Sequence, residues 1–329
     1  MSPFDCTEKP LISIIIPVYN GEKYIEQTLN SLFTQTYSNF EIIISYDEKS
    51  TDNTLAILKT IEKTHPLIID IGNDTSSGAA RNRGYLHASG KYIVFTDVDD
   101  IILPEYLESM LNVYIAHPEL DVVCCSVLFT DENKLERSIK KASQSKTGMH
   151  LVEKDNAIML KIFDVLPWGP WAHMMRRTYI EQYNLRFPDC SAREDLVFTL
   201  DAFMHTEKIG CSEKIVYLYV NHAASMTSSR FDKWWEMSIP SRSALAELSK
   251  DLPREAAEEI FYRDERLVAA GCACSSDYKT YRRQLDEYNV HRLHFYCGGD
   301  SLIGKLSVII FNISKYLYYK AMRKAKKID

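Results

Sequence analysis

Three carboxylates stand within four residues at the end of an apolar run. The run covers residues 92–96, and Asp97, Asp99 and Asp100 follow it directly. Carboxylates this close repel one another, so they persist where a cation or a proton compensates their charge. Hard oxygen ligands suit Mg²⁺ or Mn²⁺, which bind through one or two carboxylates together with substrate phosphates. For an isolated Asp-x-Asp pair, capping of the next helix is the alternative, so the surrounding elements must decide.

The first 130 residues alternate between strand and helix patterns. Continuous apolar runs predict strands buried on both faces of a sheet, and apolar residues at helical spacing predict the helices between them. The predicted strands are residues 11–18, 40–45, 67–71, 92–96 and 122–130. The predicted helices are residues 21–34, 50–61, 78–88 and 104–116. This order predicts a doubly wound α/β fold with a mostly parallel sheet flanked by helices.

Polar residues follow three of the predicted strands. Tyr19 and Asn20 follow the first strand, Asp47 the second, and residues 97–100 the fourth. Ligands of such sheets bind outside the carboxyl ends of the strands, so we expect these residues to converge on one crevice. The chain has no G-x-G-x-x-G after the first strand and no glycine-rich Lys-Ser/Thr loop. A metal ion is therefore expected to hold the phosphates.

Four motifs in this part of the chain resemble those of glycosyltransferase family 2. They are Pro17-Val18-Tyr19-Asn20, residues 47–54, Gly78-Ala79-Ala80-Arg81-Asn82-Arg83-Gly84 and Asp97-Val98-Asp99-Asp100. The resemblance runs in order from about residue 11 to residue 100 and continues more loosely to about residue 227. It implies the nucleotide-sugar-binding α/β fold called GT-A and sugar transfer with inversion at the anomeric carbon.

The resemblance also implies roles for individual residues. Asp97 and Asp99 would form the Asp-x-Asp site that meets the sugar, the ribose and a Mn²⁺ or Mg²⁺ ion. Arg81 would lie near the ribose or the diphosphate, and Pro17, Tyr19 and Asp47 would line the base and ribose pocket. The predicted donor-binding residues are Pro17, Tyr19, Asn20, Asp47, Arg81, Asp97, His222 and Ser225.

The chain departs from the family pattern after the second strand. The family usually shows two adjacent aspartates and a glycine there, whereas this chain reads Ser45-Tyr46-Asp47-Glu48-Lys49-Ser50. Tyr46 takes the place of the first aspartate, and one extra residue follows. Two interpretations of Asp47 stay open, a nucleotide contact and a turn or helix-capping role.

A second acidic pair, Glu194-Asp195, precedes apolar residues at helical spacing over residues 196–203. The helix dipole alone can explain acids at such a position. In the resembling family, however, an acidic pair in this setting supplies the catalytic base, which corresponds best to Asp195 with Glu194 supporting it. Transfer needs such a group because the acceptor hydroxyl must lose its proton as it attacks the anomeric carbon.

Two further segments have weaker interpretations. Trp168 and Trp171 could stack on an acceptor sugar, although tryptophans of this kind more often lie in the core. His173 stands near them where the family commonly has lysine. His222 and Ser225 resemble a later segment that reaches over the diphosphate in some relatives, with His222 at a position where arginine is frequent.

The composition fits a cytoplasmic enzyme. The 329 residues are 46% hydrophobic, and the formal charge of −6 argues against general nucleic-acid binding. The eight cysteines include no C-x-x-C pair, which favours reduced thiols over a zinc site or a disulfide framework. The N-terminus lacks the pattern of a signal peptide, and no run of about twenty apolar residues is present.

The chain divides into a predicted catalytic domain, residues 1–230, and a helical C-terminal extension, residues 231–329. Within the first, residues 1–130 form the nucleotide-sugar half and residues 131–230 the acceptor half. Residues 131–150 are polar and read as a loop or hairpin. Residues 234–250 and 254–273 read as helices.

The tail combines an apolar stripe with a basic end. The apolar residues at helical spacing are Leu306, Ile309, Ile310, Ile313 and Leu317, and the basic residues are Lys320, Arg323, Lys324, Lys326 and Lys327. This pattern suits a helix that lies on an anionic membrane, which would make residues 305–327 a peripheral contact at the inner face of the membrane. A terminal helix that docks on the protein is an equal alternative.

These observations predict a metal-dependent, inverting hexosyl- or N-acetylhexosaminyltransferase. It would move a sugar from a nucleoside diphosphate sugar, UDP-linked by preference, to a hydroxyl of a glycan or lipid-linked glycan in surface polysaccharide synthesis. One alternative is a sugar nucleotidyltransferase, but Tyr19-Asn20-Gly21-Glu22 is not its glycine-rich phosphate loop. The other is a non-catalytic nucleotide-sugar-binding subunit, against which the intact Asp97, Asp99 and Asp195 argue.

Overall fold

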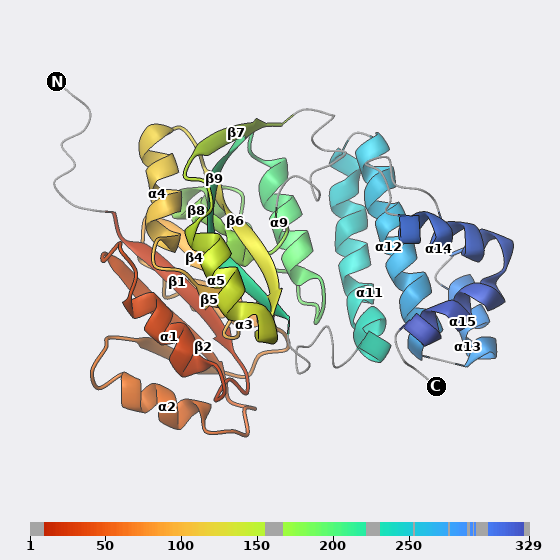
Figure 1. Cartoon of the computed structure of the whole chain (residues 1–329), viewed down its shortest axis with the longest axis horizontal. Coiled ribbons are helices and arrows are strands. Elements are labelled where there is room, and N and C mark those ends of the chain that lie inside the picture. The colour runs from red at the N-terminus through yellow and green to blue at the C-terminus, as the bar shows by residue number, and fades with distance from the viewer. Residues whose placement is uncertain are drawn as a thin grey trace. The chain divides into compact units, whose positions relative to one another are not determined.

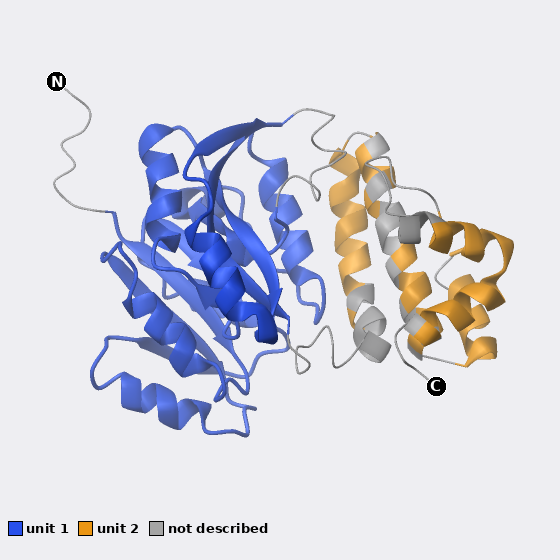
Figure 2. Cartoon of the chain, in the orientation of Figure 1, with its two compact units in different colours: residues 1–154, 166–221 blue, residues 155–165, 222–329 orange. Residues whose placement is uncertain are grey.

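The chain forms two compact units. The computed structural model describes residues 10–154, 167–221, 231–252, 254–275, 277–287, 290–291, 293 and 302–325. Unit 1 comprises residues 1–154 and 166–221, and unit 2 comprises residues 155–165 and 222–329 (Figure 2). The division into functional domains after residue 230 stays a prediction, and each unit is described by itself.

Unit 1 is built on a mixed sheet with the strand order β3-β2-β1-β4-β8-β6-β9-β5, and β7 pairs with β9 (Figure 1). The first four of these strands are parallel neighbours, whereas β8 runs antiparallel to β4 and β6. The strands are β1 (Ile12–Val18), β2 (Phe40–Asp47), β3 (Ile68–Gly72), β4 (Tyr92–Phe95), β5 (Ile101–Ile102), β6 (Val122–Asp131), β7 (Met149–Glu153), β8 (His173–Arg176) and β9 (Lys208–Asn221). The predicted α/β fold and its five predicted strands are confirmed.

Helices flank the sheet of unit 1. They are α1 (Ile25–Phe33), α2 (Thr54–Ile61), α3 (Ser77–Tyr85), α4 (Tyr106–Ala116), α5 (Leu135–Ser143), α8 (Arg177–Gln182) and α9 (Glu194–Met204), with 3₁₀ turns η1 (Glu132–Lys134) and η2 (Pro170–Ala172). Helix α1 starts later than predicted because residues 21–24 form a turn, in which the amides of Tyr24 and Ile25 both donate to the carbonyl of Gly21.

The two faces of the parallel strands are covered by different helices. Strand residues alternate between the faces, so Ile14 and Ile16 of β1 pack in one core cluster with Leu29 of α1 and Leu107 of α4. On the other face, helix α3 comes so close that a Cβ added at Gly84 would lie 2.7 Å from the Ile15 side chain. Burial on both faces explains why these strands are apolar throughout.

The structure corrects the prediction for residues 131–150. The sequence predicts a loop or hairpin there, but the structure has η1 and α5, followed by β7. Ser138 and Ala142 are four residues apart and face inward, while Lys140 and Lys141 are exposed. The segment carries apolar residues at helical spacing, Leu135, Ile139 and Ala142, but its largely polar composition favours a loop when composition alone is weighed.

Unit 2 is helical in the part of the chain that the structure describes. Its helices are α11 (Phe231–Leu248), η3 (Ser249–Asp251), α12 (Arg254–Ser275), α13 (Tyr278–Glu287), α14 (Leu302–Ile313) and α15 (Lys315–Ala325). The helices predicted over residues 234–250 and 254–273 are confirmed. No helix among the described residues is long and apolar enough to cross a membrane.

The tail consists of two helices instead of one continuous helix. The break lies at Ser314, whose hydroxyl accepts a hydrogen bond from the Leu317 amide at 3.3 Å and so caps α15. Val308, Phe311 and Tyr318 are buried in a core cluster with residues of α12 and α13. A second set of apolar side chains from the same two helices is exposed: Leu306, Ile309, Ile313, Tyr316 and Leu317.

Candidate active site

The site lies where β1 and β4 separate at their carboxyl ends. The pairing of β1 with β4 ends at Ile15 and Phe95, whereas its pairing with β2 continues to Val18 and Tyr46. The chain continues from β1 to β2 on one side, and β4 lies on the other, which makes this edge a topological switch point. Pro17 and Asp97 both stand at this opening, as the sequence analysis predicts for a ligand crevice.

Asn20 fixes the loop on the β1 side of the site. Its backbone is left-handed, with φ of 49°, and its amide nitrogen donates to Ser50 Oγ at 3.1 Å. The Asn20 side-chain oxygen accepts a hydrogen bond from the Thr51 amide at 2.8 Å. Asn20 therefore connects the loop after β1 to the loop before α2. The neighbouring Tyr19 side chain is 58% exposed and is available to a ligand.

Asp47 forms a turn at the end of β2. Its Oδ1 accepts a hydrogen bond from the Lys49 amide at 2.9 Å, so the turn role that we consider for this residue is present. Strand alternation directs Tyr46 into the core beside Ile44, where it is buried. Tyr46 therefore cannot replace an aspartate in the crevice, and a nucleotide contact of Asp47 stays a prediction.

The three acids after β4 have different environments. Asp97 and Asp99 are half-buried, but Asp100 is buried and accepts hydrogen bonds from Tyr217 Oη at 2.7 Å and from the Val220 amide at 2.9 Å. Burial, and then the charges of Asp97 and Asp99, raise the pKa of Asp100 well above its ordinary value. Asp100 thus attaches the turn to β9, a role that sequence reasoning missed.

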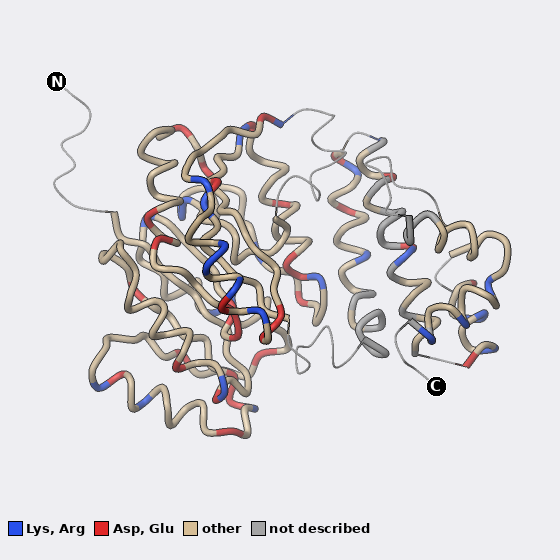
Figure 3. Tube along the Cα trace, in the orientation of Figure 1, with Lys and Arg blue, Asp and Glu red and all other residues tan. Residues whose placement is uncertain are grey.

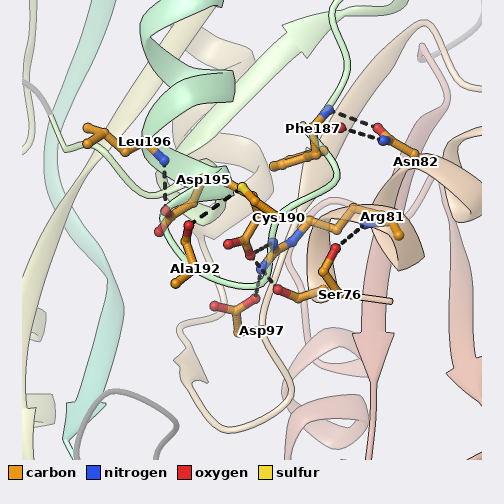
Figure 4. A network of polar contacts seen from close by, with 12 residues as sticks. Ser76, Arg81, Asn82, Asp97, Phe187, Cys190, Ala192, Asp195 and Leu196 are labelled. Carbon is orange, nitrogen blue, oxygen red and sulfur yellow. Dashed lines mark hydrogen bonds and ion pairs between the residues drawn. The ribbon is translucent and has the colours of Figure 1, made fainter. Parts of the chain in front are cut away.

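Arg81 of α3 joins the acids after β4 to the start of α9. Its Nη2 lies 2.6 Å from Asp97 Oδ1, and its Nη1 lies 3.2 Å from Glu194 Oε1. Figure 4 shows the Arg81 side chain reaching Asp97. Burial alone would lower the pKa of Arg81, but the charges of Asp97 and Glu194 raise it. The Ser77 hydroxyl also donates to Glu194 Oε1. The predicted donor site and the predicted base therefore belong to one network.

The small residues of α3 allow the segment that leads into α9 to lie close to this helix. A Cβ at Gly78 would lie 2.8 Å from Glu194 Cγ and 2.9 Å from Phe187 Cβ. The side-chain amide of Asn82 makes two hydrogen bonds with the backbone of Phe187 (Figure 4). Its Nδ2 donates to the Phe187 carbonyl at 2.8 Å, and its Oδ1 accepts from the Phe187 backbone nitrogen at 3.0 Å. The motif over residues 78–84 is therefore a docking surface for the segment that leads into α9. Its glycines and Asn82 could have signalled such packing, but not the partner.

Asp195 lies in the first turn of α9, two residues after Arg193, whose backbone is strained. Arg193 has a φ of 64°, which is uncommon for a residue with a side chain. Burial, followed by the charge of Glu194, raises the pKa of Asp195 to about 7, although the charge of Arg81 lowers it. Its Oδ1 accepts a hydrogen bond from the Leu196 amide at 2.7 Å. A half-buried carboxylate with this pKa can accept a proton near neutral pH.

The remaining candidates fall into two groups. Trp171 is buried and stacks on Tyr217 with ring centroids 5.0 Å apart, so its core interpretation is confirmed, whereas Trp168 is 40% exposed. His173 is buried, and burial lowers its pKa to about 4, so it is neutral near pH 7 and does not replace the charge of a lysine. His222 and Ser225 lie outside the described residues.

Asp97 and Asp99 are the side chains that fit a divalent metal. Both follow β4 at the switch point and are half-buried, and carboxylate oxygens are ligands that suit Mg²⁺ or Mn²⁺. Among the residues that the structure describes, no three or more His, Cys, Asp or Glu side chains are grouped to hold a metal ion. The donor set thus fits an ion whose remaining ligands come from substrate phosphates and water.

Sequence comparison shows the family. A sequence model described as glycosyl transferase family 2 matches residues 13–183, which span the switch point, the acids after β4 and the docking motif of α3. The chain belongs to glycosyltransferase family 2. It is 30% identical over 283 residues to the uncharacterized glycosyltransferase EpsJ of Bacillus subtilis, covering 84% of this chain and 76% of EpsJ.

One further sequence relative and one solved structure are also similar to this chain. Poly(ribitol-phosphate) beta-glucosyltransferase of Bacillus spizizenii is 31% identical over 214 residues, which are 64% of this chain and 32% of that enzyme. The crystal structure of S. aureus TarS 1–349 in complex with UDP-GlcNAc is similar in fold, with a TM-score of 0.64 and 19% identity, covering 96% of this chain and 91% of TarS 1–349. The predicted GT-A fold is confirmed.

Proposed function

We propose that this glycosyltransferase moves a sugar from a UDP-linked donor to a hydroxyl of a glycan or lipid-linked glycan, with a divalent metal and with inversion at the anomeric carbon. The observation that carries the proposal is the position of Arg81 between Asp97 and Glu194. Through these two contacts, Arg81 joins the acids that suit the metal ion of a donor diphosphate to the acidic pair that suits deprotonation of an acceptor. Surface polysaccharide synthesis is the proposed setting, because the related Bacillus spizizenii enzyme acts on poly(ribitol phosphate).

The donor side of the site consists of residues at the switch point. Asp99 is the proposed metal ligand, and Asp97, which Arg81 orients, is proposed to meet the sugar or ribose and to share the metal. Tyr19 and Pro17 are proposed to line the base pocket, together with Asp47. UDP is the preferred nucleotide because TarS binds UDP-GlcNAc. The diphosphate contacts of His222 and Ser225 are proposed from the sequence resemblance alone.

When bound, Mn²⁺ or Mg²⁺ would neutralise charge on the leaving diphosphate. Side chains of the protein orient the donor and accept the proton of the acceptor. Asp97 and Asp99 orient the donor, and Asp195 accepts the proton of the acceptor hydroxyl. As that oxygen forms a bond to the anomeric carbon from one side, the bond to the diphosphate oxygen breaks on the other. Arg81 and Ser77 hold Glu194, and so position the first turn of α9 that carries Asp195.

Donor turnover tests this function without a known acceptor. The protein is incubated with UDP-glucose, UDP-GlcNAc or GDP-mannose, with Mn²⁺ or with EDTA, and release of nucleoside diphosphate is followed. We expect slow release from one UDP-sugar, dependent on metal. Release that EDTA leaves unchanged would contradict the proposed metal dependence. Release from GDP-mannose alone would contradict the proposal that the donor nucleotide is UDP. No release from any donor, together with no nucleotide binding, would favour a non-catalytic subunit.

We also propose that the exposed apolar face of α14 and α15 contacts an anionic membrane surface from the cytoplasmic side. This face comprises Leu306, Ile309, Ile313, Tyr316 and Leu317. Figure 3 shows basic residues on the helices near the C-terminus, and Lys320 and Lys324 of α15 are exposed. Docking through Val308, Phe311 and Tyr318 uses the opposite side of the same helices, so it does not compete with membrane contact.

A further inference from the structure

Phe129 is an exposed aromatic residue near the end of β6. Its side chain is 53% exposed, although β6 is buried over its first half. Phe129 lies 5.2 Å from Tyr219 and 6.3 Å from Trp171, measured between ring centroids. Trp171 in turn stacks on Tyr217. Phe129 is therefore the exposed edge of an aromatic array in which Tyr219 is half-buried and Trp171 and Tyr217 are buried.

The strand register places this array on the same face as the acids of the site. Phe129 pairs with Tyr219, and two residues further along Asp131 pairs with Asn221. Side chains alternate along a strand, so Tyr217, Tyr219 and Asn221 share one face of β9. Tyr217 Oη donates to Asp100, and burial, then the charges of Asp100 and Asp97, raise the pKa of Tyr219. The aromatic array thus adjoins the acid cluster.

The end of β6 also lies beside the donor loop. Lys23, four residues after Tyr19, forms an ion pair of 3.0 Å with Glu132, which directly follows β6. The end of β6 is therefore linked to the loop after β1 by this ion pair, and the inner part of the array is linked to the turn after β4 by the hydrogen bond from Tyr217 to Asp100. A single exposed hydrophobic residue normally needs no explanation. Here, however, its position at the rim of the site is an independent observation.

We propose that Phe129 and Tyr219 form a platform for one sugar ring of the acceptor. The apolar face of a pyranose packs well on an aromatic ring, and the polar groups at its edge need hydrogen-bond partners. Asn221, which pairs with Asp131 two residues further along, is exposed and can supply such a partner, whereas Asp131 forms an ion pair with Lys134. The platform rests on the proposed glycosyltransferase function and specifies its acceptor as a glycan. It replaces Trp171, which is buried, as the aromatic surface for the acceptor.

Saccharide binding tests the platform separately from the donor site. The probes are methyl β-glucoside, methyl β-galactoside and methyl β-N-acetylglucosaminide, followed by saturation-transfer NMR with and without UDP and Mn²⁺. The variants are Phe129→Ala, Phe129→Tyr and, as a control, Leu86→Ala, which truncates another exposed side chain at the end of α3. UDP affinity of each protein is measured by calorimetry, and folding by thermal melting.

We expect at least one saccharide to bind the wild type. Phe129→Ala should weaken that binding by about fivefold, while Phe129→Tyr and Leu86→Ala retain it. UDP affinity and melting temperature should stay unchanged in all three. Binding that Phe129→Ala leaves intact, or a wild type that binds none of the saccharides, would overturn the platform. A wild type that does not bind UDP would instead overturn the proposed donor site.

Discussion

Arg81 Nη2 lies 2.6 Å from Asp97 Oδ1, in a place where the arginine side chain is only 5% exposed. The same guanidinium contacts Glu194, which is 113 residues away in the sequence. Removing one partner of a buried ion pair leaves the other charges uncompensated, and that is usually more costly than the pair is stabilising. The relationship therefore has consequences for stability as well as for the geometry of the site.

The first prediction concerns Arg81 itself. Arg81→Met should lower the free energy of unfolding by about 3–5 kcal/mol, because the buried Glu194 and the half-buried Asp97 would remain without their cation. Urea denaturation measures this change. Arg254→Met is the control, since Arg254 is 90% exposed and pairs with Glu258 at the surface; it should cost less than about 1 kcal/mol. Equal effects of the two substitutions would show that the Arg81 network does not hold the site together.

The second prediction separates the acids after β4. Asp99→Ala should abolish the enhancement of UDP binding by Mn²⁺, because Asp99 is the proposed metal ligand. Asp100→Asn should retain it, since the raised pKa of Asp100 favours its neutral form and asparagine has the same shape. Calorimetric titration with UDP, with and without Mn²⁺, measures both. Metal-enhanced binding that survives in Asp99→Ala would remove this residue from the metal site.

The third prediction concerns the tail. Ile313→Glu combined with Leu317→Glu should reduce sedimentation with phosphatidylglycerol vesicles, because both side chains belong to the exposed apolar face. Deleting the tail is a poorer test, since Val308, Phe311 and Tyr318 belong to the core of unit 2. Ile115→Glu, at an exposed position of α4, is the control. Sedimentation of the double variant at the wild-type level would leave the tail as a docked element only.

The sequence predicts five strands of the sheet, but it predicts neither β5, β7, β8 and β9 nor the network around Arg81. Strands such as β1 are apolar throughout because they are buried on both faces, so their pattern is local and strong. By contrast, the contact between Arg81 and Glu194 depends on how α9 packs against α3, and no local pattern encodes it. Gly78 marks a close approach, but only the structure identifies Glu194 and Phe187 as the groups that approach.

The errors have physical reasons too. The polar composition of α5 favours a loop, although Leu135, Ile139 and Ala142 stand at helical spacing within it. The apolar stripe of the tail is continuous in the sequence, but the structure divides it into two helices at Ser314 and places Val308, Phe311 and Tyr318 of these helices in the core. The sequence does not predict the exposure of Phe129, since an exposed aromatic residue in a strand pattern cannot be distinguished from a buried one.

The fourth prediction is a pH dependence. Asp195 must be ionised to accept a proton, and its pKa is raised to about 7, so kcat/KM should rise about tenfold per pH unit below pH 7 and level off above it. The stability of the fold depends on pH in the opposite direction to the activity. The folded protein keeps a proton on Asp195 that the unfolded chain loses near pH 4, so this group makes the protein less stable as pH rises from about 4 to about 7. Activity measured from pH 5 to 9 with a stable protein checks the first part. A flat profile over that range would exclude a base with this pKa.

The most direct test of the account is the Asp195→Asn variant, because asparagine keeps the shape of the side chain but cannot accept the proton. Sugar transfer is measured by release of UDP in the presence of an acceptor, alongside UDP affinity and melting temperature at pH 8. We expect transfer to fall by roughly 10²–10⁴-fold, with unchanged UDP affinity and a melting temperature no lower than that of the wild type, because the variant removes a charge that burial disfavours. A stable variant that transfers sugar at nearly the normal rate, or a melting temperature that falls in proportion to the activity, would contradict the assignment of Asp195 as the base.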